Sequence, residues 1–368
     1  MVAENVSIGI LSLPSAVATL GLVPSIILLL GISGISWYTA YVICHCCSWC
    51  SLWPAISCLT STVLMNVLTD HGTCTIVFGV ISLVVSCVGA LPRTMGKVYY
   101  LSIACQILSI VAATVATMIA VGVELKGSIP IAATTHLSFN EDLPLLLLTT
   151  FYPTVGHASF FGFISEMDKP REFPNALSVL QIIDTSLYLA NAVVIYRYVG
   201  EDVQSPALGS AGPLMKKVAY GLAILTVLIA GIVNGHIASK YVYVRIFRGS
   251  HHMQESSLLS VGSWVAIGII LWILAWVIAE SIPVFNDLLS LITALFGCWV
   301  TYGFPALFWF LLNKGSCFSS AKKIFLTVSN LFILIMAITI CGLGLYVSGD
   351  AVSKTSSDAD WTCANNAS

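Results

Sequence analysis

The chain has 368 residues, of which 58% are hydrophobic and only 9% are charged, and its mean hydropathy is +0.94. A soluble globular protein carries about 25% charged residues, so this composition excludes a water-facing surface and predicts an all-α polytopic membrane protein. Fifteen Lys and Arg against 17 Asp and Glu give a net charge of −2, which excludes a nucleic-acid binder with its basic surface.

Apolar runs separated by Gly, Pro or charged residues predict about eleven membrane-spanning helices, each of which needs roughly 20 apolar residues. In chain order they lie at residues 4–22, 23–45, 52–69, 72–91, 98–124, 143–167, 174–198, 217–246, 258–280, 287–312 and 322–348. The third is short and contains Pro54, and the orientation of every later helix depends on it. We therefore expect one transmembrane transporter-like domain over residues 1–348 and a short polar tail over 349–368.

Basic residues in the short connections predict the orientation of the chain in the membrane. With the N-terminus in the cytoplasm and the tail outside, nine Lys and Arg lie inside and five lie outside. The inside group is Arg93, Lys97, Lys169, Arg171, Arg245, Arg248, Lys314, Lys322 and Lys323, and the outside group is Lys126, Arg197, Lys216, Lys217 and Lys354. The sequence Asn366-Ala-Ser is then an external glycosylation acceptor or a chance match.

Two of the predicted helices contain sequence that interrupts a membrane helix. These are SIGILSLP (Ser7–Pro14) in the first helix and FYPTVGHASFFGF (Phe151–Phe163) in the sixth. Irregular backbone in hydrocarbon is tolerated where it lines a cavity, and many transporters contain two inverted five-helix repeats that each begin with a broken helix. Simple kinks at Gly and Pro are the alternative interpretation.

The two breaks are the predicted substrate site, because freed backbone groups can bind the carboxylate and ammonium groups of an amino acid. Neither break contains a charged residue, which favours a neutral amino acid. His157 is the titratable group there, and it either carries protons or is held by backbone in a structural role. The substrate-binding residues are Ser7, Ile8, Gly9, Ile10 and Leu11 in the first break and Thr154, Val155, Gly156 and His157 in the second.

Five segments share a pattern with one known family: AENVSIGILSLPSAVATLGLVP (Ala3–Pro24), LTDHGTCTIVFGVIS (Leu68–Ser82), LPRTMGKVYYLS (Leu91–Ser102), GHASFFGFISEMDKPREFPNAL (Gly156–Leu177) and NGHIASKYVYVRI (Asn234–Ile246). Through them the sequence resembles the amino acid/auxin permease family, most closely its fungal neutral amino acid transporters. The resemblance covers nearly the whole chain except Cys44–Ser57. It implies a fold like that of the sodium-coupled leucine transporter, with helices one to five and six to ten as inverted repeats.

The resemblance also implies a function: secondary active transport of neutral amino acids by alternating access, with protons as the coupling ion in the fungal members. The expected partners are an amino acid and the lipid bilayer, with no cofactor besides a coupling proton or sodium ion, no metal and no enzymatic activity. The plasma membrane is favoured over the vacuolar membrane. The short sequence before Ser7 and the unmatched Cys44–Ser57 leave a non-transporting membrane sensor, or a defective, truncated paralogue, as the alternative.

In the resembled fold a cation site lies between the first break and the middle of helix eight. Asn234 lies near that middle and is assigned as the ion-coupling residue, with Gly231 and Ala238 beside it for close approach to helix one. His236 points about 200° around the helix and is expected to pack elsewhere. A plain interhelical hydrogen bond is the alternative role for Asn234.

The remaining polar and sulfur-containing residues give weaker signals. Asp184 and Lys240 are candidates because charges inside a membrane are costly, and Glu166, Asp168, Lys169 and Arg171 are expected to form a cytoplasmic ion-pair cluster. The group Cys44, His45, Cys46, Cys47 and Cys50 matches no closed four-ligand zinc spacing, so palmitoylation or no role is favoured over metal binding. Seven cysteines in apolar runs are interpreted as small hydrophobic residues: Cys44, Cys58, Cys74, Cys87, Cys105, Cys298 and Cys341.

Overall fold

A computed structural model describes twelve stretches of the chain, and every structural statement below concerns them. They are residues 13–18, 20–43, 53–70, 72–93, 157, 160, 163–164, 167–200, 213–250, 257–282, 285–355 and 363. These residues form helices and the turns between them, with no strand in the described part. The all-helical fold is therefore confirmed.

Six of the described helices are long and apolar enough to cross a membrane, which confirms a polytopic membrane protein. They are Leu22–Val42, Pro170–Val199, Pro213–Ile246, Leu258–Ser281, Leu288–Leu312 and Ala321–Asp350. Two shorter apolar helices, Ser57–Leu68 and Thr75–Ala90, accompany them. The predicted helices at 98–124 and, for the most part, 143–167 lie outside the described residues.

The chain divides into two compact units, each built from segments far apart in the sequence. The first unit contains residues Met1–Trp49, Met118–Ala211 and Leu289–Val352, and the second contains Cys50–Thr117, Gly212–Leu288 and Ser353–Ser368. A short helix, α12 (Phe285–Ile292), includes the boundary between them.

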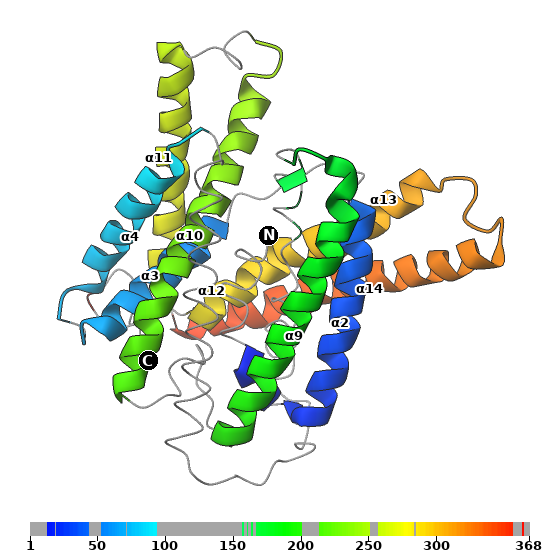
Figure 1. Ribbon diagram of the computed structural model, residues 1–368, viewed down its shortest axis with the longest axis horizontal. Coiled ribbons are helices and arrows are strands. Elements are labelled where there is room, and N and C mark those ends of the chain that lie inside the picture. The colour runs from blue at the N-terminus through cyan, green and yellow to red at the C-terminus, as the bar shows by residue number, and fades with distance from the viewer. Residues whose placement is uncertain are drawn as a thin grey trace. The chain divides into compact units, whose positions relative to one another are not determined.

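In the first unit, α2 (Leu22–Ile43) lies beside α9 (Phe173–Val199), as Figure 1 shows. A short 3₁₀ turn, η3 (Pro170–Glu172), leads into α9. Gln181 Nε2 on α9 donates to Ser33 O on α2 at 3.2 Å, and Asn330 Nδ2 on α14 (Ala321–Thr355) donates to the Tyr38 hydroxyl at 2.6 Å. Polar bonds between buried faces thus supplement apolar packing, as is usual where lipid supplies no hydrophobic drive between helices.

The predicted helix at 287–312 is not a regular α-helix. It begins as α12, continues as the π-helical segments η7 (Thr293–Gly297) and η8 (Trp299–Gly303), and ends as α13 (Phe304–Leu312). The N–H groups of Cys298 and Phe304 bond to Thr293 O and Trp299 O, five residues back. Single π turns are common at functional sites, so this helix joins the two predicted breaks as an irregular element.

In the second unit, α10 (Pro213–Ile246) packs against α3 (Trp53–Leu68), α4 (Thr75–Ala90) and α11 (Leu258–Ser281), all of which lie around it in Figure 1. The irregular third predicted helix is therefore present as α3. Glycines on α10 permit the approach, because a Cβ at Gly231 would lie 2.8 Å from Ser57 Cβ on α3, and one at Gly235 would lie 2.7 Å from the Trp272 ring on α11.

The contact between Gly235 and the Trp272 ring predicts a large loss of stability even when the glycine is replaced by alanine. Gly235→Ala is expected to destabilise the protein by about 1–3 kcal/mol, because the fully buried Trp272 ring must shift to make room. The measurement is the melting temperature of purified protein in detergent. Gly262→Ala on α11 is the matched control, since nothing lies within 4 Å of its added Cβ. Equal melting temperatures for the two variants would contradict this packing.

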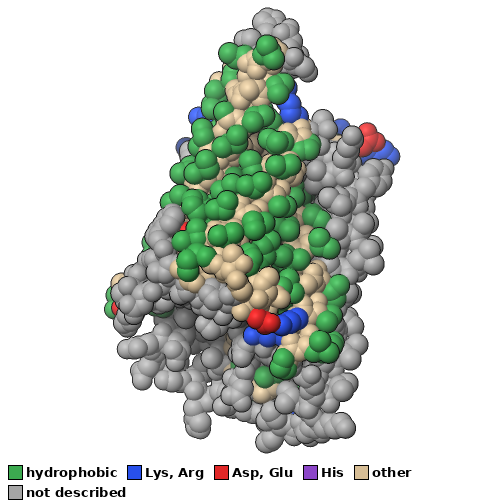
Figure 2. Space-filling view, turned by 90° about the vertical axis from the view of Figure 1, so that its left-hand side faces the viewer, with side chains coloured by type: hydrophobic (Ala, Val, Ile, Leu, Met, Phe, Trp, Pro, Cys, Tyr) green, Lys and Arg blue, Asp and Glu red, His purple; other side chains and the backbone are tan. Residues whose placement is uncertain are grey.

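The outer faces of α4 and α11 carry large exposed hydrophobic side chains. Figure 2 shows one face on which hydrophobic side chains form a nearly continuous cover and the charged groups lie toward its ends. On a soluble protein such an area would be an interaction site, but here it is the surface that meets lipid. The α4 residues concerned are Val77, Val80, Ile81, Val84, Val85 and Val88.

The interpretation of Cys74 as a small hydrophobic residue is wrong. Cys74 lies immediately before α4 and forms a disulfide with Cys363 in the tail, 289 residues away in sequence. Cys74 stands at the end of an apolar run and not inside it, so its sulfur can bond to a residue outside the packed helices. Of the other described cysteines assigned to packing, Cys58 and Cys298 are buried thiols, and Cys87 and Cys341 are partly buried.

Candidate functional site

His157, from the second predicted break, is buried in the first unit and bonded to α2. Its Nε2 lies 3.0 Å from Ser36 O and 3.1 Å from Thr39 Oγ1. A carbonyl oxygen only accepts, so Nε2 carries the hydrogen of this bond. His157 is thus held by the backbone of α2 through Nε2.

The bonds around His157 form a small polar group inside an apolar cluster. Thr39 Oγ1 also donates to Ser36 O, at 3.0 Å, so this carbonyl accepts from both side chains. The Phe160 ring lies 5.1 Å from the imidazole and 5.8 Å from the ring of Phe173 at the start of α9. This apolar shell strengthens the polar bonds that it encloses.

The other predicted substrate-binding residues cannot be placed. Ser7–Leu11 and Thr154–Gly156 lie outside the described residues, as do Cys44–Cys50 and Asn366. The structure thus brings together His157, Ser36 and Thr39, of which the sequence singled out only His157. Within the described part of the chain, no three His, Cys, Asp or Glu side chains are placed to hold a metal ion.

A polar stripe on α9 was only partly recognised in the sequence. Asp184 lies near the middle of this 27-residue helix and is 2% exposed. Gln181, Tyr188 and Asn191 are buried on the same helix, at steps of three, four and three residues that place all four side chains on one face. This spacing of polar residues along a helix is the sequence pattern from which the stripe could have been predicted. Polar side chains on an inward face of a membrane helix are typical of ion or substrate pathways.

Asn234, the predicted ion-coupling residue, is half-buried on α10 and donates from Nδ2 to Ala230 O of its own helix at 3.0 Å. Its neighbour Gly231 does permit a close approach, but the helices that use it are α3 and α11, through Ser57 and Trp272. Helix one at its predicted break lies outside the described residues. The assignment of Asn234 to a cation site therefore stays a prediction.

His236, two residues on, is buried and packs edge-on against Trp264 of α11, with ring centroids 5.3 Å apart. Its expected role in packing agrees with this contact. Lys240, one turn later, is half-buried. Trp264 itself donates from Nε1 to Leu91 O at 2.9 Å, so it anchors the end of α4 to α11.

Glu280 is a buried acid that was not among the predicted site residues. It lies in the last turn of α11, 6% exposed, and accepts from Trp276 Nε1 at 3.2 Å. A Cβ at Gly79 of α4 would lie 2.2 Å from its carboxylate oxygen Oε1, so the glycine makes room for this acid. Glu280 could have been selected from the sequence because it is the one acidic residue in the apolar run Leu258–Ser281.

The predicted cytoplasmic ion-pair cluster contains one pair among the described residues, at the start of α9. Lys169 Nζ lies 3.7 Å from Glu172 Oε1, and both side chains are more than half exposed. The partner is Glu172, which was not among the residues predicted for this cluster. An exposed pair contributes little to stability, about 0–1 kcal/mol.

Comparison with known proteins matches nearly the whole chain to one family. A family model described as "Transmembrane amino acid transporter protein" matches residues 1–51 and 48–348. The two matches contain the two predicted breaks, and they meet inside Cys44–Ser57, the segment that the sequence reading could not match.

Three curated fungal proteins are similar over most of their length. The N amino acid transport system protein of Neurospora crassa is 32% identical over 387 residues, which cover 95% of this chain and 82% of that protein. Proteins named transmembrane transporter from Gibberella moniliformis and Fusarium pseudograminearum are each 29% identical, over 345 and 343 residues, and cover 83% of this chain and 72% of their own length.

Proposed function

Because the chain belongs to the transmembrane amino acid transporter protein family, we propose that it carries neutral amino acids across the plasma membrane, coupled to protons, by alternating access. Transport of amino acids and the absence of an enzymatic role follow from the family. The neutral substrate, the coupling ion and the membrane are parts of the proposal.

The observation that carries the neutral substrate is the composition of the two breaks. Ser7–Leu11 and Thr154–His157 contain backbone-exposing residues and no Asp, Glu, Lys or Arg. A charged side chain of a substrate would need an opposite charge at this depth, since isolated charges in a membrane are costly. Recognition through backbone N–H and C=O groups serves the carboxylate and ammonium that all amino acids share.

Proton coupling is supported by two buried titratable groups in the first unit. His157 is buried and holds α2 through Nε2, and Asp184 is buried near the middle of α9. A histidine titrates near pH 6.5 when unperturbed. Alternating access is supported by the division of the chain into two compact units, since such transporters work by moving one rigid body against another.

The test is uptake of labelled amino acids by cells that lack their own permeases. Expression should raise uptake of neutral amino acids well above that of Lys or Glu, and more at pH 5.5 than at pH 7.5. Protein at the cell surface, measured in parallel, controls for sorting. Equal uptake of charged and neutral substrates would contradict the neutral site, and no uptake by protein at the surface would favour the non-transporting sensor.

Substitutions on α10 test the coupling residue. Asn234→Ala is expected to weaken the dependence of uptake on the driving cation several-fold, because it removes an uncharged side-chain oxygen. His236→Gln should have a smaller effect on that dependence, since His236 packs against Trp264. The measurement is uptake against pH and against sodium concentration, normalised to surface protein. The reverse ranking in folded variants would overturn the assignment of Asn234.

A further inference from the structure

The disulfide between Cys74 and Cys363 lies outside everything that the family match implies. The match ends at residue 348, whereas Cys363 is the one cysteine of the tail that follows. Cys363 is exposed, and its partner stands directly before α4. The bond therefore joins the far end of the chain to the connection between α3 and α4.

A disulfide between a cysteine at a helix end and one in the tail requires both to be on the same side of the membrane, so an even number of spans must separate them. In the described part of the chain, five helices long and apolar enough to cross a membrane lie between Cys74 and Cys363, together with the shorter apolar helix α4, which we count as a sixth span. The five are α9, α10, α11, the helix over Leu288–Leu312, and α14. The predicted helices at 98–124 and 143–167 raise the number to eight. Both counts are even, as the bond demands.

The chemistry of the bond then selects the side. Disulfides persist in oxidising compartments and are rare where thiols are kept reduced, as in the cytosol. The tail and the α3–α4 connection are thereby assigned to the extracytoplasmic face. The count of basic residues in the connections led independently to the same orientation.

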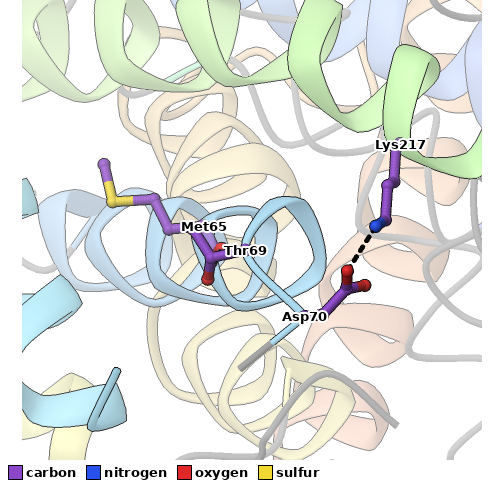
Figure 3. Close-up of polar contacts among 4 residues, drawn as sticks. All are labelled: Met65, Thr69, Asp70 and Lys217. Atoms are coloured by element: carbon purple, nitrogen blue, oxygen red, sulfur yellow. Dashed lines mark hydrogen bonds and ion pairs between the residues drawn. The ribbon is translucent and has the colours of Figure 1, made fainter. Parts of the chain in front are cut away.

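The connection that receives the tail is itself held to α10. Lys217 of α10 pairs with the Asp70 carboxylate, and Figure 3 shows the two side chains pointing toward each other from α10 and from the end of α3. Thr69, the residue before Asp70, donates from Oγ1 to Met65 O on α3 at 2.9 Å. Asn66 Nδ2 donates to Thr75 Oγ1 at 3.1 Å across the turn, so Cys74 lies on an anchored turn.

We propose that Cys74 and Cys363 form an extracytoplasmic disulfide that straps the C-terminal tail to the second unit. The chain leaves the first unit at Val352, and the bond returns it to the second unit. Eight residues follow Thr355 up to Cys363, and an extended chain of that length spans at most about 28 Å. The bond therefore tethers the end of α14 covalently to the turn before α4.

The bond forms by thiol–disulfide exchange. The two cysteine thiols give up two protons and two electrons, and a disulfide-carrying oxidoreductase of the secretory compartment is reduced to its dithiol. An external phosphine or dithiol reverses the reaction by supplying the two electrons. The strap is therefore open to reduction from outside the cell, since Cys363 is exposed.

The cross-link is tested without any transport assay, so the result does not depend on the proposed function. A protease site inserted between residues 201 and 212 divides the chain into one part with Cys74 and another with Cys363. On a denaturing gel without reductant the two parts should migrate as one band, and with reductant as two. Cys74→Ser and Cys363→Ser should give two bands in both cases, and Cys87→Ser should behave as wild type. Two bands from unreduced wild type would overturn the proposal.

Sidedness is tested with a maleimide that does not cross membranes, applied to reduced, sealed vesicles of known orientation. Cys363 should react only when the extracytoplasmic face is outermost. Cys317, between α13 and α14, lies one span away and should react only in the opposite orientation, with Cys363→Ser and Cys317→Ser assigning each signal. Reaction of both cysteines from the same side would overturn the topology.

Melting temperatures test whether the bond acts as a strap. Each single variant, Cys74→Ser or Cys363→Ser, should lower the melting temperature by several degrees, and the double variant should lower it no further, because the two residues form one bond. Unchanged melting in both single variants, or additive losses, would show that the bond does not restrain the tail.

Discussion

Gly9→Val and Gly156→Val are expected to reduce amino acid uptake to background while leaving the protein in its membrane. Each residue lies in a predicted break, where the substrate is proposed to bind backbone groups directly. Glycine has no Cβ and lets a ligand approach the chain, whereas a branched side chain fills the space that the carboxylate or ammonium would occupy. Uptake of a labelled neutral amino acid, divided by the amount of surface protein, measures the effect.

Two other glycines serve as matched controls for that experiment. Gly34 on α2 and Gly342 on α14 have nothing within 4 Å of an added Cβ, so their replacement by Val should leave uptake near the wild-type rate. They separate the loss of a ligand site from the general cost of valine in a membrane helix. Uptake at the wild-type rate in both Gly9→Val and Gly156→Val would remove the broken-helix site from the proposed function.

Replacement of His157 should separate its two roles, as an anchor and as a proton carrier. His157→Leu removes the N–H that Ser36 O and Thr39 Oγ1 receive, and it should destabilise the protein by about 1–3 kcal/mol, the usual cost of a lost buried partner. His157→Gln can restore an N–H donor to α2 but cannot titrate. We expect it to melt near the wild-type temperature and to lose the rise in uptake between pH 7.5 and pH 5.5.

The control for the His157 variants is Thr39→Val. It removes one oxygen of the polar group and leaves the Ser36 carbonyl and the imidazole in place, so it should keep the pH dependence of uptake. A His157→Gln variant with the wild-type pH profile would assign His157 to the structural role alone and leave Asp184 as the buried proton carrier of the first unit.

For the helices that the structure describes, the sequence predicted existence and limits well, because membrane burial depends on local hydrophobicity. The helix predicted at 174–198 is α9 over Phe173–Val199, and the one at 258–280 is α11 over Leu258–Ser281. Even the short segment at 52–69, with Pro54 near its start, is helical as α3. The last helix extends to Thr355, beyond the predicted end at 348, because helical backbone continues through polar residues that a hydropathy window rejects.

Contacts between residues far apart in the sequence could not be predicted as well. Gly231 was predicted to permit close approach to helix one, and among the described residues the helices that approach it are α3 and α11. Cys74 and Cys363 are 289 residues apart, and nothing local distinguishes a cysteine at the end of an apolar run from a buried thiol. The bonds of His157 to α2 likewise depend on how two distant helices pack.

The π-helical segments η7 and η8 determine which side chains of the helix at 287–312 share one face. Ala294, Cys298, Tyr302 and Ala306 are all buried in one core cluster with Ile32 of α2 and Ile333 of α14. They recur every four residues, and on a regular α-helix that step turns by 40° beyond a full rotation, or 120° over the three steps. The wider π turns reduce this drift, so the four side chains can all face the same cluster. A π turn closes with a bond to the fifth residue back instead of the fourth, so the alignment of these four side chains depends on the number of residues between Thr293 and Gly303 as well as on their type.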